Sequence, residues 1–597
     1  MSHTPSDPSR RTFLKSSSML ATGSLLVGFE LPYSLASAPK ASGAASLMTD
    51  AFIRIDRDNT ITVLMNHAEF GNGVYTSLAM MVAEELDIDW QRLRWEAAPT
   101  EPRYYSPIFG EYLTAGSVST AGAFMPMRTA GAKTKALLLQ AAGLLWQTDA
   151  VQLSTDAGWI AHSDGRRVSY GGLIEVIQDH NLEPPKTVVL KPASAFSVLG
   201  FPKKRIEAPE KVTGRALFGI DIKRPGMIYG AVARPPVYGS RVIAFDDKAA
   251  RAIPGVLKVK AIDAGVVVLA TDYWTASKGA KALTIQWDDL GLGQLSTASF
   301  TEEYRALSKT DGLLAEDIGD AKGLHETASA VHEAVYEMPY LAHATMEPMN
   351  CTAQVFDDRC EIWVGTQNQG NDRTVVANML GLPEASVVIN RTLMGGTFGR
   401  RASKTADFIT DAVQAAQGET VPVQIIWSRE EDIRGGHYRP LFVHRLRGTV
   451  DTEGYPASWH QTAVGQSIMQ HTKHDPTYMV RGIDIYSVDG CLQEPFGVFP
   501  YGTSYRIPHH RVESHNPPKI GVRPHEWRAV GHTHTGVAYE CFLDELAHLG
   551  GKDPLALRLH LTQDNDRMHQ LLLRLKEAAD WDQPLAAGRG RGVAARV

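Results

Sequence analysis

Cysteine is scarce in this sequence. The 597 residues include four cysteines, Cys351, Cys360, Cys491 and Cys541, and none of them has CxxC spacing. Zinc ribbons and iron–sulfur clusters need closely spaced cysteine ligands, and disulfide scaffolds need many cysteines in a short chain. The sequence therefore predicts none of these within this chain. A single bridge between Cys351 and Cys360 stays open as an alternative if the protein is exported.

Long tracts of lysine and arginine are also absent. The formal net charge is −6 and the pI is about 6.4, with no basic run along the chain. Because nucleic-acid-binding proteins present clustered positive charge, nucleic acid is not an expected partner. No period of about 20–50 residues repeats, which excludes a solenoid. With 44% hydrophobic and 21% charged residues, the chain has a globular composition and the length of about three or four domains.

Several familiar catalytic motifs are missing as well. The nearest approach to a G-x-S-x-G turn reads GQSIM at residues 465–469, which disfavours a serine acyl-transfer enzyme. His343 and Glu347 are four residues apart and share one face if that segment is helical. His532 and His534 could present two imidazoles from a strand. A metallohydrolase built on these four residues stays an alternative, although 21 histidines make chance clusters expected.

The first 38 residues have the pattern of a signal peptide. Paired Arg10 and Arg11 precede a moderately apolar stretch over residues 19–29, and small residues end it at 36–38. The stretch is too short to span a membrane, and the paired arginines are typical of twin-arginine export. Because that route moves folded proteins, we expect a periplasmic protein that carries a cofactor assembled in the cytoplasm. A basic, disordered tail is the alternative.

The remaining sequence predicts an α+β protein with several domains. After a linker of small residues, strand-like and helix-like runs alternate over residues 48–201. Residues 206–290 are rich in strand patterns, with one helix in TASKGAKALT and a closing strand in IQWDD. We expect a polar, helical connector over 294–329 and a third unit over 330–597.

The stretch LMGGTFGRR, residues 393–401, is a glycine-rich turn. Apolar periodicity predicts a strand before it at 386–390, a helix after it at 406–416 and a second strand at 421–425. Neither the Rossmann nor the P-loop glycine spacing is present. Backbone amides at such a turn, flanked by two arginines, can still bind an anionic or oxo group. The alternative is a strand-to-helix turn that binds nothing.

Two further glycine-rich segments precede predicted helices. One is EFGNGVYTSLAMMVAEEL, in which Gly71 and Gly73 flank Asn72, and the other is WRAVG at residues 527–531. The helix after the second segment is expected to stop at Gly550-Gly551, with Pro554 just inside the next helix. Three such segments, far apart in sequence, suit a large, extended cofactor that backbone groups hold from several sides.

The segments MGGTFGRR, HATMEPMN, WVGTQNQ, IIWSREEDI and ECFLDELAHLGGKDPLALRL, together with the two above, carry a family resemblance. They resemble the molybdopterin-binding large subunit of the xanthine dehydrogenase/aldehyde oxidase family. The closest branch is that of the isoquinoline 1-oxidoreductase beta subunit and related membrane-associated aldehyde dehydrogenases. Residues 206–290 are similar to the a/b hammerhead domain of that family. The resemblance implies an N-terminal molybdopterin-binding-type domain over 48–201 and a molybdopterin-binding domain over 330–597.

The resemblance also implies a cofactor and partners. Molybdenum would be held by the dithiolene of a pterin, with or without an added nucleotide, so the protein need supply no metal ligand. The family hydroxylates N-heterocycles or oxidises aldehydes with oxygen from water. Electrons leave through a small subunit with [2Fe–2S] clusters, in some systems onward to a membrane-associated c-type cytochrome. The expected cofactor-binding residues are Gly71, Asn72, Gly73, Gly395, Gly396, Thr397, Phe398, Gly399, Arg400, Trp527, Arg528, Ala529, Val530 and Gly531.

This sequence departs from the family pattern at four places. Asn72 replaces a glutamine, which shortens the side chain by about 1.5 Å, a large gap for a hydrogen bond. Ala115 and Thr397 each replace a glycine. The family's general-base glutamate lies in a later segment, which nothing before Val597 matches, so we expect a truncated chain that is inactive alone. A non-catalytic cofactor-binding or assembly protein is the alternative.

Overall fold

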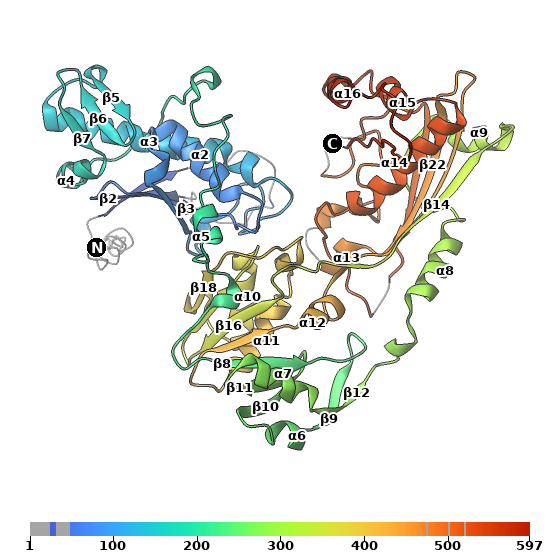
Figure 1. The fold of residues 1–597 in the computed structure, drawn as a ribbon, viewed down its shortest axis with the longest axis horizontal. Coiled ribbons are helices and arrows are strands. Elements are labelled where there is room, and N and C mark those ends of the chain that lie inside the picture. The colour runs from blue at the N-terminus through green and yellow to red at the C-terminus, as the bar shows by residue number, and fades with distance from the viewer. Residues whose placement is uncertain (1–23, 31–47, 473–475, 499–501, 519–520, 597) are drawn as a thin grey trace, which may run out of the picture. The chain divides into compact units, whose positions relative to one another are not determined.

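The protein is described by a computed structural model, which covers residues 24–30, 48–472, 476–498, 502–518 and 521–596. The chain forms two compact units that interleave along the sequence. The first unit comprises Met1–Ile228, Asn350–Gly396 and Thr405–Ile425, and the second comprises Tyr229–Met349, Thr397–Lys404 and Ile426–Val597. Each unit mixes helices with sheets (Figure 1), which confirms the predicted α+β multidomain class. The expected domain bounds at 48–201, 206–290 and 330–597 stay predictions.

A four-stranded sheet begins the first unit. Its order is β1-β2-β3-β4, with β3 and β4 parallel and the other neighbours antiparallel. The strands are β1 (Ser24–Glu30), β2 (Met48–Asp56), β3 (Ile61–Met65) and β4 (Leu93–Ala97). Most of the expected signal peptide lies outside the described residues, but its residues 24–30 form β1. Helices α2 (Val74–Leu86) and α3 (Ser119–Trp146) pack against this sheet.

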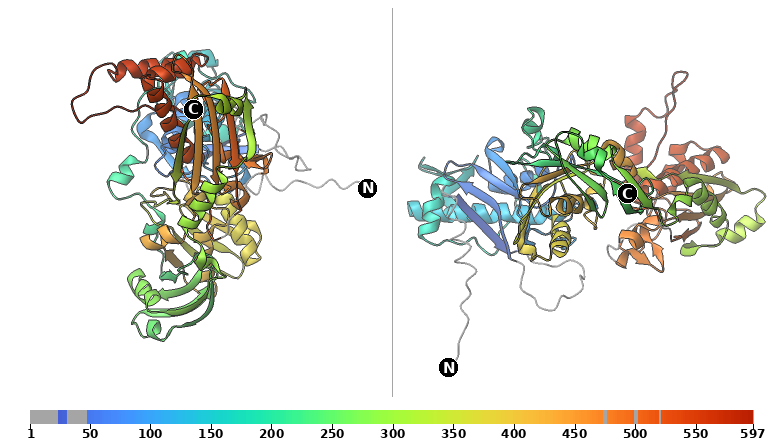
Figure 2. Two further views of the ribbon diagram at one scale, coloured as in Figure 1. Left: turned by 90° about the vertical axis from the view of Figure 1, so that its right-hand side faces the viewer. Right: turned by 90° about the horizontal axis from the view of Figure 1, so that it is seen from below.

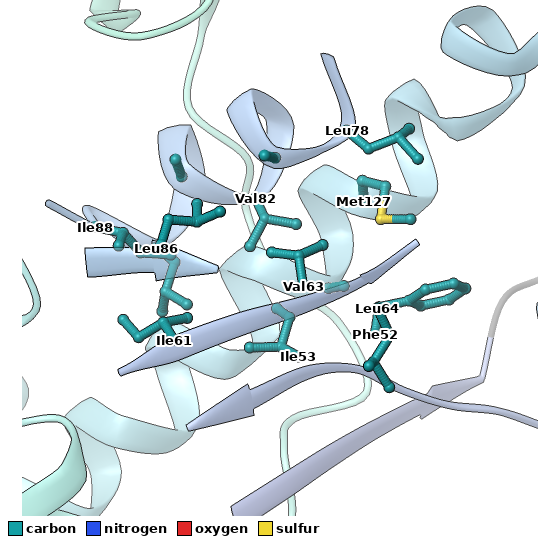
Figure 3. Packing of buried hydrophobic residues seen from close by; sticks show 14 of the residues in the cluster. Phe52, Ile53, Ile61, Val63, Leu64, Leu78, Val82, Leu86, Ile88 and Met127 are labelled. Atoms are coloured by element: carbon teal, nitrogen blue, oxygen red, sulfur yellow. The ribbon is translucent and has the colours of Figure 1, made fainter. Parts of the chain in front are cut away.

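The core between this sheet and its helices follows the sequence periodicity. Leu78, Val82 and Leu86 recur every four residues along α2 and face the strands (Figure 3). Their partners include Ile61 and Val63 from β3, and all five side chains are 0% exposed. Burying each contributes about 1.5–3 kcal/mol. The same residues that predicted an amphipathic helix therefore fix α2 on the sheet.

A second part of the first unit carries the predicted glycine turn. Strand β18 (Val387–Arg391) precedes the turn, and helix α11 (Asp407–Ala416) and strand β19 (Val423–Ile426) follow it, which confirms the predicted strand, helix and strand. The local strand order is β19-β16-β17-β18, with β17 and β18 parallel. The other elements here are β16 (Asn350–Val355), β17 (Cys360–Val364) and α10 (Gln369–Leu380). The first unit also contains β5 (Leu153–Asp156), β6 (Trp159–His162), β7 (Arg167–Ser169), α4 (Ile174–Asp179) and α5 (Ala208–Val212).

The second unit begins with the strand-rich region expected within 206–290. Strands β8 (Ile228–Ala233), β11 (Gly265–Ala270) and β10 (Val256–Ile262) pair antiparallel, and so do β9 (Arg241–Asp246) and β12 (Thr284–Asp288). Helices α6 (Lys248–Arg251) and α7 (Tyr273–Lys281) accompany them. The predicted strands and helix of this region are confirmed.

The connector over 294–329 is only partly helical. Helices α8 (Thr297–Leu307) and α9 (Ala321–Thr327) flank a strand, β13 (Leu313–Ile318). The prediction of a purely helical connector was therefore wrong. The reason is a long-range contact, because β13 pairs antiparallel with β25 (His509–His515), almost 200 residues later.

A five-stranded sheet and its covering helix form the rest of the second unit. The order is β13-β25-β22-β21-β14, and helix α14 (His532–Leu549) lies along the sheet (Figures 1 and 2). Trp459 of β22 packs on Tyr539 and Phe542 of α14, with ring centroids 4.2 and 5.0 Å apart. Pro554 is the first residue of α15, as predicted. The remaining elements are β14 (His332–Met338), β15 (Leu341–Ala342), β20 (Tyr438–Arg439), β21 (Phe442–Val450), β22 (Pro456–Gly465), β23 (Met479–Val480), β24 (Ile483–Asp484), α12 (Arg429–Arg434), α13 (Ile468–Thr472), α15 (Pro554–Leu561) and α16 (Asp566–Ala578).

Two further features of the fold are the state of the cysteines and the apolar character of the helices. All four cysteines are free thiols in the structure, so the alternative of a Cys351–Cys360 bridge has no support here. Over the described ranges, no helix combines the length and apolar character that a membrane span requires.

The contact between α2 and α3 depends on Gly131. A Cβ atom at this position would lie 2.9 Å from the Val82 carbonyl oxygen and 3.1 Å from the Glu85 Cβ. Gly131→Val should therefore lower stability by about 1–3 kcal/mol, although valine favours helix more than glycine does. The measurement is chemical denaturation followed by circular dichroism. Ala121→Val, at an exposed position of the same helix, is the control, and equal stability of the two variants would contradict the packing argument.

Candidate functional site

The glycine turn before α2 closes around a buried carboxylate. Glu69 is 1% exposed. Its Oε1 accepts hydrogen bonds from the amides of Gly71 and Gly73 at 2.7 and 3.3 Å, and its Oε2 accepts from the amide of Tyr75 at 3.4 Å. Gly71 and Gly73 have positive φ angles of 101° and 78°, which glycine adopts without strain. The turn thus folds its own N–H groups onto one side chain.

A basic segment compensates the charge of Glu69. Arg205 and Lys211 place nitrogen atoms 3.9 and 3.8 Å from its Oε1, and both also pair with Glu207. Arg205 donates a further hydrogen bond to the Gly71 carbonyl at 2.8 Å. Glu207 itself accepts from Thr76 in the first turn of α2 at 3.3 Å. Residues 205–211 therefore fasten the turn from the outside, because a buried carboxylate without a partner is costly.

Asn72 stands at the exposed tip of this turn. Its Oδ1 lies 3.5 Å from the amides of Phe70 and Val74, and its Nδ2 lies 3.4 Å from the Ala68 carbonyl oxygen. These distances are at the limit of hydrogen bonding, so the carboxamide is only weakly held by its own turn. Within the same unit, the Met394 amide donates to the Glu69 carbonyl at 3.4 Å. The turn therefore lies beside Gly395 and Gly396, the latter with φ 98°.

The second unit brings Phe398 and Gly399 against the segment that precedes α14. Gly399 has φ 105°, and an added Cβ would collide with the Glu526 carbonyl oxygen. The Arg528 amide donates to the Phe398 carbonyl at 2.7 Å. The rings of Phe398 and Trp527 stack with centroids 6.2 Å apart. Two of the segments that the sequence predicted as cofactor-binding are therefore in direct contact within this unit.

Buried arginines adjoin the contact between residues 397–401 and 525–531, which we call the junction. Arg400 and Arg401 are each 1% exposed, and Thr397 before them is equally buried. The Arg401 guanidinium donates to the Glu347 carboxylate at 3.1 Å and to the Glu347 carbonyl at 3.0 Å. Arg400 lies over the Trp427 ring, 5.4 Å from its centroid. Burial lowers the pKa of Arg401, while the nearby carboxylate favours its charged form.

Histidines hold the backbone of the junction. His525 Nε2 is 3.1 Å from the Gly399 carbonyl oxygen, and its Nδ1 is 2.7 Å from the Glu526 carboxylate. His343 Nε2 is 2.8 Å from the Glu526 carbonyl oxygen, and its Nδ1 is 3.1 Å from that of His437. The neutral His343 ring has one N–H, which we assign to Nε2 because its contact with the Glu526 carbonyl oxygen is the shorter of the two. Burial lowers the pKa of His343 to about 3, which keeps the ring neutral.

Gly531 ends the segment and is the N-cap of α14. A Cβ on it would lie 2.5 Å from the Tyr486 carbonyl oxygen, so no larger residue fits. Val530 before it has φ 48°, and its carbonyl accepts from the Thr533 hydroxyl at 2.7 Å. Burial raises the pKa of Asp489, beside Gly531, to about 7 and lowers that of His532 to about 4. Near neutral pH the His532 ring is therefore mainly neutral, whereas Asp489 is about half ionised.

The backbone donors of the second unit fit an oxygen-rich cofactor. The amides of Phe398, Trp527 and Ala529 find no acceptor within the part of the chain that the structure describes. Ala529 and Arg528 are exposed, and Phe398 and Trp527 are half-buried. Such N–H groups are the donors that an anionic or oxo group requires. The pterin would bring its own sulfur ligands for the metal, so these donors need no metal-binding side chain beside them.

The metal-binding alternative has no support from the geometry. Residues 343–347 are not helical, and His343 contacts backbone carbonyls while Glu347 pairs with Arg401. His532 and His534 lie in the first turn of α14, so the expectation of a strand there was wrong. Over the described ranges, no group of three or more histidine, cysteine, aspartate or glutamate residues could hold a metal ion.

Sequence reasoning missed the residues that support the turns. Glu69, His525 and Glu526 directly adjoin the predicted segments, so closeness in sequence was a usable signal for them. His343 was considered as a metal ligand, although its role is to bind backbone. Nothing in the sequence links His343 to Glu526, which lies 183 residues later.

Two cofactor-binding families match this chain. Residues 27–209 match one and residues 308–479 match another, and both are described as Molybdopterin cofactor-binding domain. The chain belongs to the molybdopterin-binding large subunits of the xanthine dehydrogenase family. The resemblance inferred from the sequence is thereby confirmed. The family is one of molybdopterin-dependent oxidoreductases.

Curated relatives of this large subunit extend over most of its length. It is 26% identical over 92% of its length to the beta subunit of isoquinoline 1-oxidoreductase from Brevundimonas diminuta, of which it covers 74%. It is 30% identical over 85% of its length to a protein of Gluconacetobacter polyoxogenes named membrane-bound aldehyde dehydrogenase [pyrroloquinoline-quinone], of which it covers 66%. It is 26% identical to a nicotinate dehydrogenase chain of Pseudomonas putida, of which it covers 50%.

Solved structures support the fold of the large subunit. Quinoline 2-oxidoreductase from Pseudomonas putida 86 matches 63% of this chain and 53% of its own, with a TM-score of 0.50 and 17% identity. An aldehyde oxidoreductase from Desulfovibrio gigas matches 85% of this chain and 57% of its own, with a TM-score of 0.50 and 15% identity. At these identities the likeness concerns the fold alone.

The neutral state of His343 predicts a pH dependence of stability. Its pKa falls from 6.5 to about 3 on folding, so the unfolded chain binds the proton first as the pH decreases. Above about pH 6.5 this histidine costs the folded chain no stability. Stability is lost progressively from there toward pH 3, and the loss at pH 5 is about 2 kcal/mol. His343→Gln should therefore lose less stability between pH 7 and pH 5 than the unaltered chain does.

Guanidinium denaturation at the two pH values measures this difference. His548→Gln alters an exposed histidine of the same unit and is the matched control. If His343→Gln showed the same pH-dependent loss as the control, the imidazole would not be held neutral.

Proposed function

We propose that this chain is the large subunit of a molybdenum hydroxylase that oxidises an aldehyde or hydroxylates an N-heterocycle with oxygen from water. The observation that carries the proposal is the position of the glycine turns. Gly71–Gly73 lies inside one matched cofactor-binding domain, and 395–400 lies inside the other. The names of the relatives suggest the substrate classes, which are isoquinoline, nicotinate and aldehydes. When bound, the molybdenum centre would supply oxygen-atom transfer and accept two electrons.

The residues of this chain would hold the cofactor mainly through their backbone. In the second unit, the amides of Phe398, Trp527 and Ala529 would donate to its oxygen atoms. Buried Arg400 would favour its negative charge. Gly399 keeps the backbone free of a side chain at the point where the two segments of the second unit meet.

The partners of the proposed enzyme follow from the family resemblance. Electrons would leave through a small subunit with two [2Fe–2S] clusters and could pass onward to a c-type cytochrome. The chain spans between half and three quarters of the length of the curated relatives described above. The activity, substrates and partners of the whole enzyme are therefore proposed for it. A protein that binds the cofactor without turnover is the alternative, and cofactor content and activity measured together separate the two.

Molybdenum and pterin content test the proposal directly. The chain, co-expressed with its small subunit in a molybdate-fed host, should contain about one molybdenum and one pterin per polypeptide. Gly399→Ala should lose most of both, because its Cβ would collide with Glu526 and φ 105° is strained for alanine. The measurements are elemental analysis and the fluorescence of the oxidised pterin.

Gly418→Ala is the matched control for this substitution. Gly418 also has a positive φ, 78°, but an added Cβ would meet nothing within 4 Å. It should therefore keep its cofactor despite similar backbone strain. Wild-type protein that contains pyrroloquinoline quinone, or neither cofactor, would overturn the proposal. Cofactor without any oxidation of isoquinoline, nicotinate or aldehydes, when the segment with the general-base glutamate is also supplied, would favour the non-catalytic alternative.

We further propose that the protein is exported to the periplasm through the twin-arginine route. The support is the sequence pattern of residues 1–38, with Arg10 and Arg11 at its front. Replacing both arginines by lysine should keep the protein in the cytoplasm with its N-terminus intact. Cell fractionation and N-terminal sequencing measure this, and periplasmic protein in the double variant would contradict the proposal.

A further inference from the structure

The first unit contains a cavity beside its two glycine turns. Its volume is about 880 Å³, within the range of small-molecule sites. The cavity lies between the end of β18, strand β4 and the segment 206–224. Tyr75 and Leu393, at the edges of the turns, line it, but none of the residues predicted to bind the cofactor does.

Aromatic rings form one side of the cavity. Tyr75 and Trp363 are 2% and 6% exposed, and Trp95 is half-buried. The rings of Tyr75 and Trp95 are 4.8 Å apart between centroids. Trp363 of β17 lies opposite Asn390 of the parallel strand β18, whose next residue is Arg391. The strand pairing thus sets the Trp363 ring near a cation.

The charged residues of the cavity are mostly arginines. Arg94, Arg215, Arg224 and Arg391 line it, against a single acidic residue, Glu210. Arg224 lies over the Trp363 ring, 4.3 Å from its centroid. Among the described residues, none of these four guanidinium groups forms a salt bridge. Lining arginines without carboxylate partners make the cavity strongly attractive to anions.

Arg391 is the most constrained of these cations. One of its terminal nitrogens donates to the Met65 carbonyl at 2.6 Å. Its Nε is buried and has no hydrogen-bond acceptor among the described residues. This Nε has almost no exposed surface, so a ligand in the cavity would meet Arg391 at the part of its side chain that lines the cavity. The positive charge of that side chain favours a ligand with an anionic group.

We propose that this cavity binds a small aromatic anion, a flat ring that bears a carboxylate or phosphate group. The ring would lie against Trp363 and Trp95, and the anionic group would accept hydrogen bonds from Arg224 and Arg391. Planar guanidinium groups bind such groups in a bidentate manner, and they also stack on rings. Both the ring and the charge are required, because the cavity offers a complementary surface to each.

Calorimetric titration of the full chain with five probes tests the two requirements separately. Phenyl phosphate and benzoate carry both features, benzamide keeps the aromatic ring without the charge, and inorganic phosphate and cyclohexanecarboxylate keep the charge without the aromatic ring. The first two should bind at least about tenfold more tightly than the other three. Tighter binding of phenyl phosphate would assign the site to phosphate esters, and tighter binding of benzoate would assign it to carboxylates.

Arg224→Gln and Trp363→Leu should each weaken the better probe by at least about fivefold. Arg359→Gln is the matched control, since Arg359 is also exposed and lies over a ring, that of Phe356 at 3.7 Å, outside the cavity. Molybdenum content should be unchanged in Arg224→Gln, which separates this inference from the proposed function. The inference is overturned if no probe saturates, if benzamide binds as well as benzoate, or if Arg224→Gln and Arg359→Gln bind alike.

Discussion

A glycine-rich turn has few side chains to cover its backbone N–H and C=O groups. The groups that hydrogen-bond to this backbone therefore decide what else the turn can bind. In the first unit the carboxylate of Glu69 takes the amides of Gly71, Gly73 and Tyr75. In the second unit it is the carbonyl groups of the turn that form the hydrogen bonds with the neighbouring segment. There the carbonyls of Phe398 and Gly399 are bound by the Arg528 amide and by His525, while nearby amides remain without an acceptor in the described chain. The second turn is therefore the one with amides left to bind the proposed cofactor.

The two turns have different kinds of buried charge near them. A buried carboxylate is tolerated in the first unit because Arg205 and Lys211 lie close to it. The second unit instead buries cations and neutral rings. Arg401 pairs with Glu347, and His343 stays uncharged because burial lowers its pKa, with a smaller contribution from the nearby charge of Arg400. The second unit thus pairs its buried charges close to amides that have no acceptor in the described chain, and in the proposed function these amides would bind the anionic cofactor.

Much of the local structure was predictable from the sequence, whereas the distant side chains that hold the turns in place were not. Strand β18, helix α11 and helix α2 were predicted because apolar spacing and glycines act over a few residues. Strand β13 was missed because it forms only by pairing with β25. His343 was first considered as a metal ligand for the same reason. Its partner Glu526 lies 183 residues away, and no local pattern records such a contact.

A turn that acts through its backbone constrains its residues only by φ and by the space around Cβ. This explains how the chain accommodates its departures from the family pattern. Thr397 and Ala115 lie outside the left-handed region, which their neighbours Phe398 and Gly116 adopt instead. Thr397 even adds a contact, since its hydroxyl lies 3.4 Å from the Gly399 amide. Gly399 has no such freedom, because its φ and the Glu526 carbonyl both exclude a side chain. The positions that differ are therefore those where the backbone geometry leaves room.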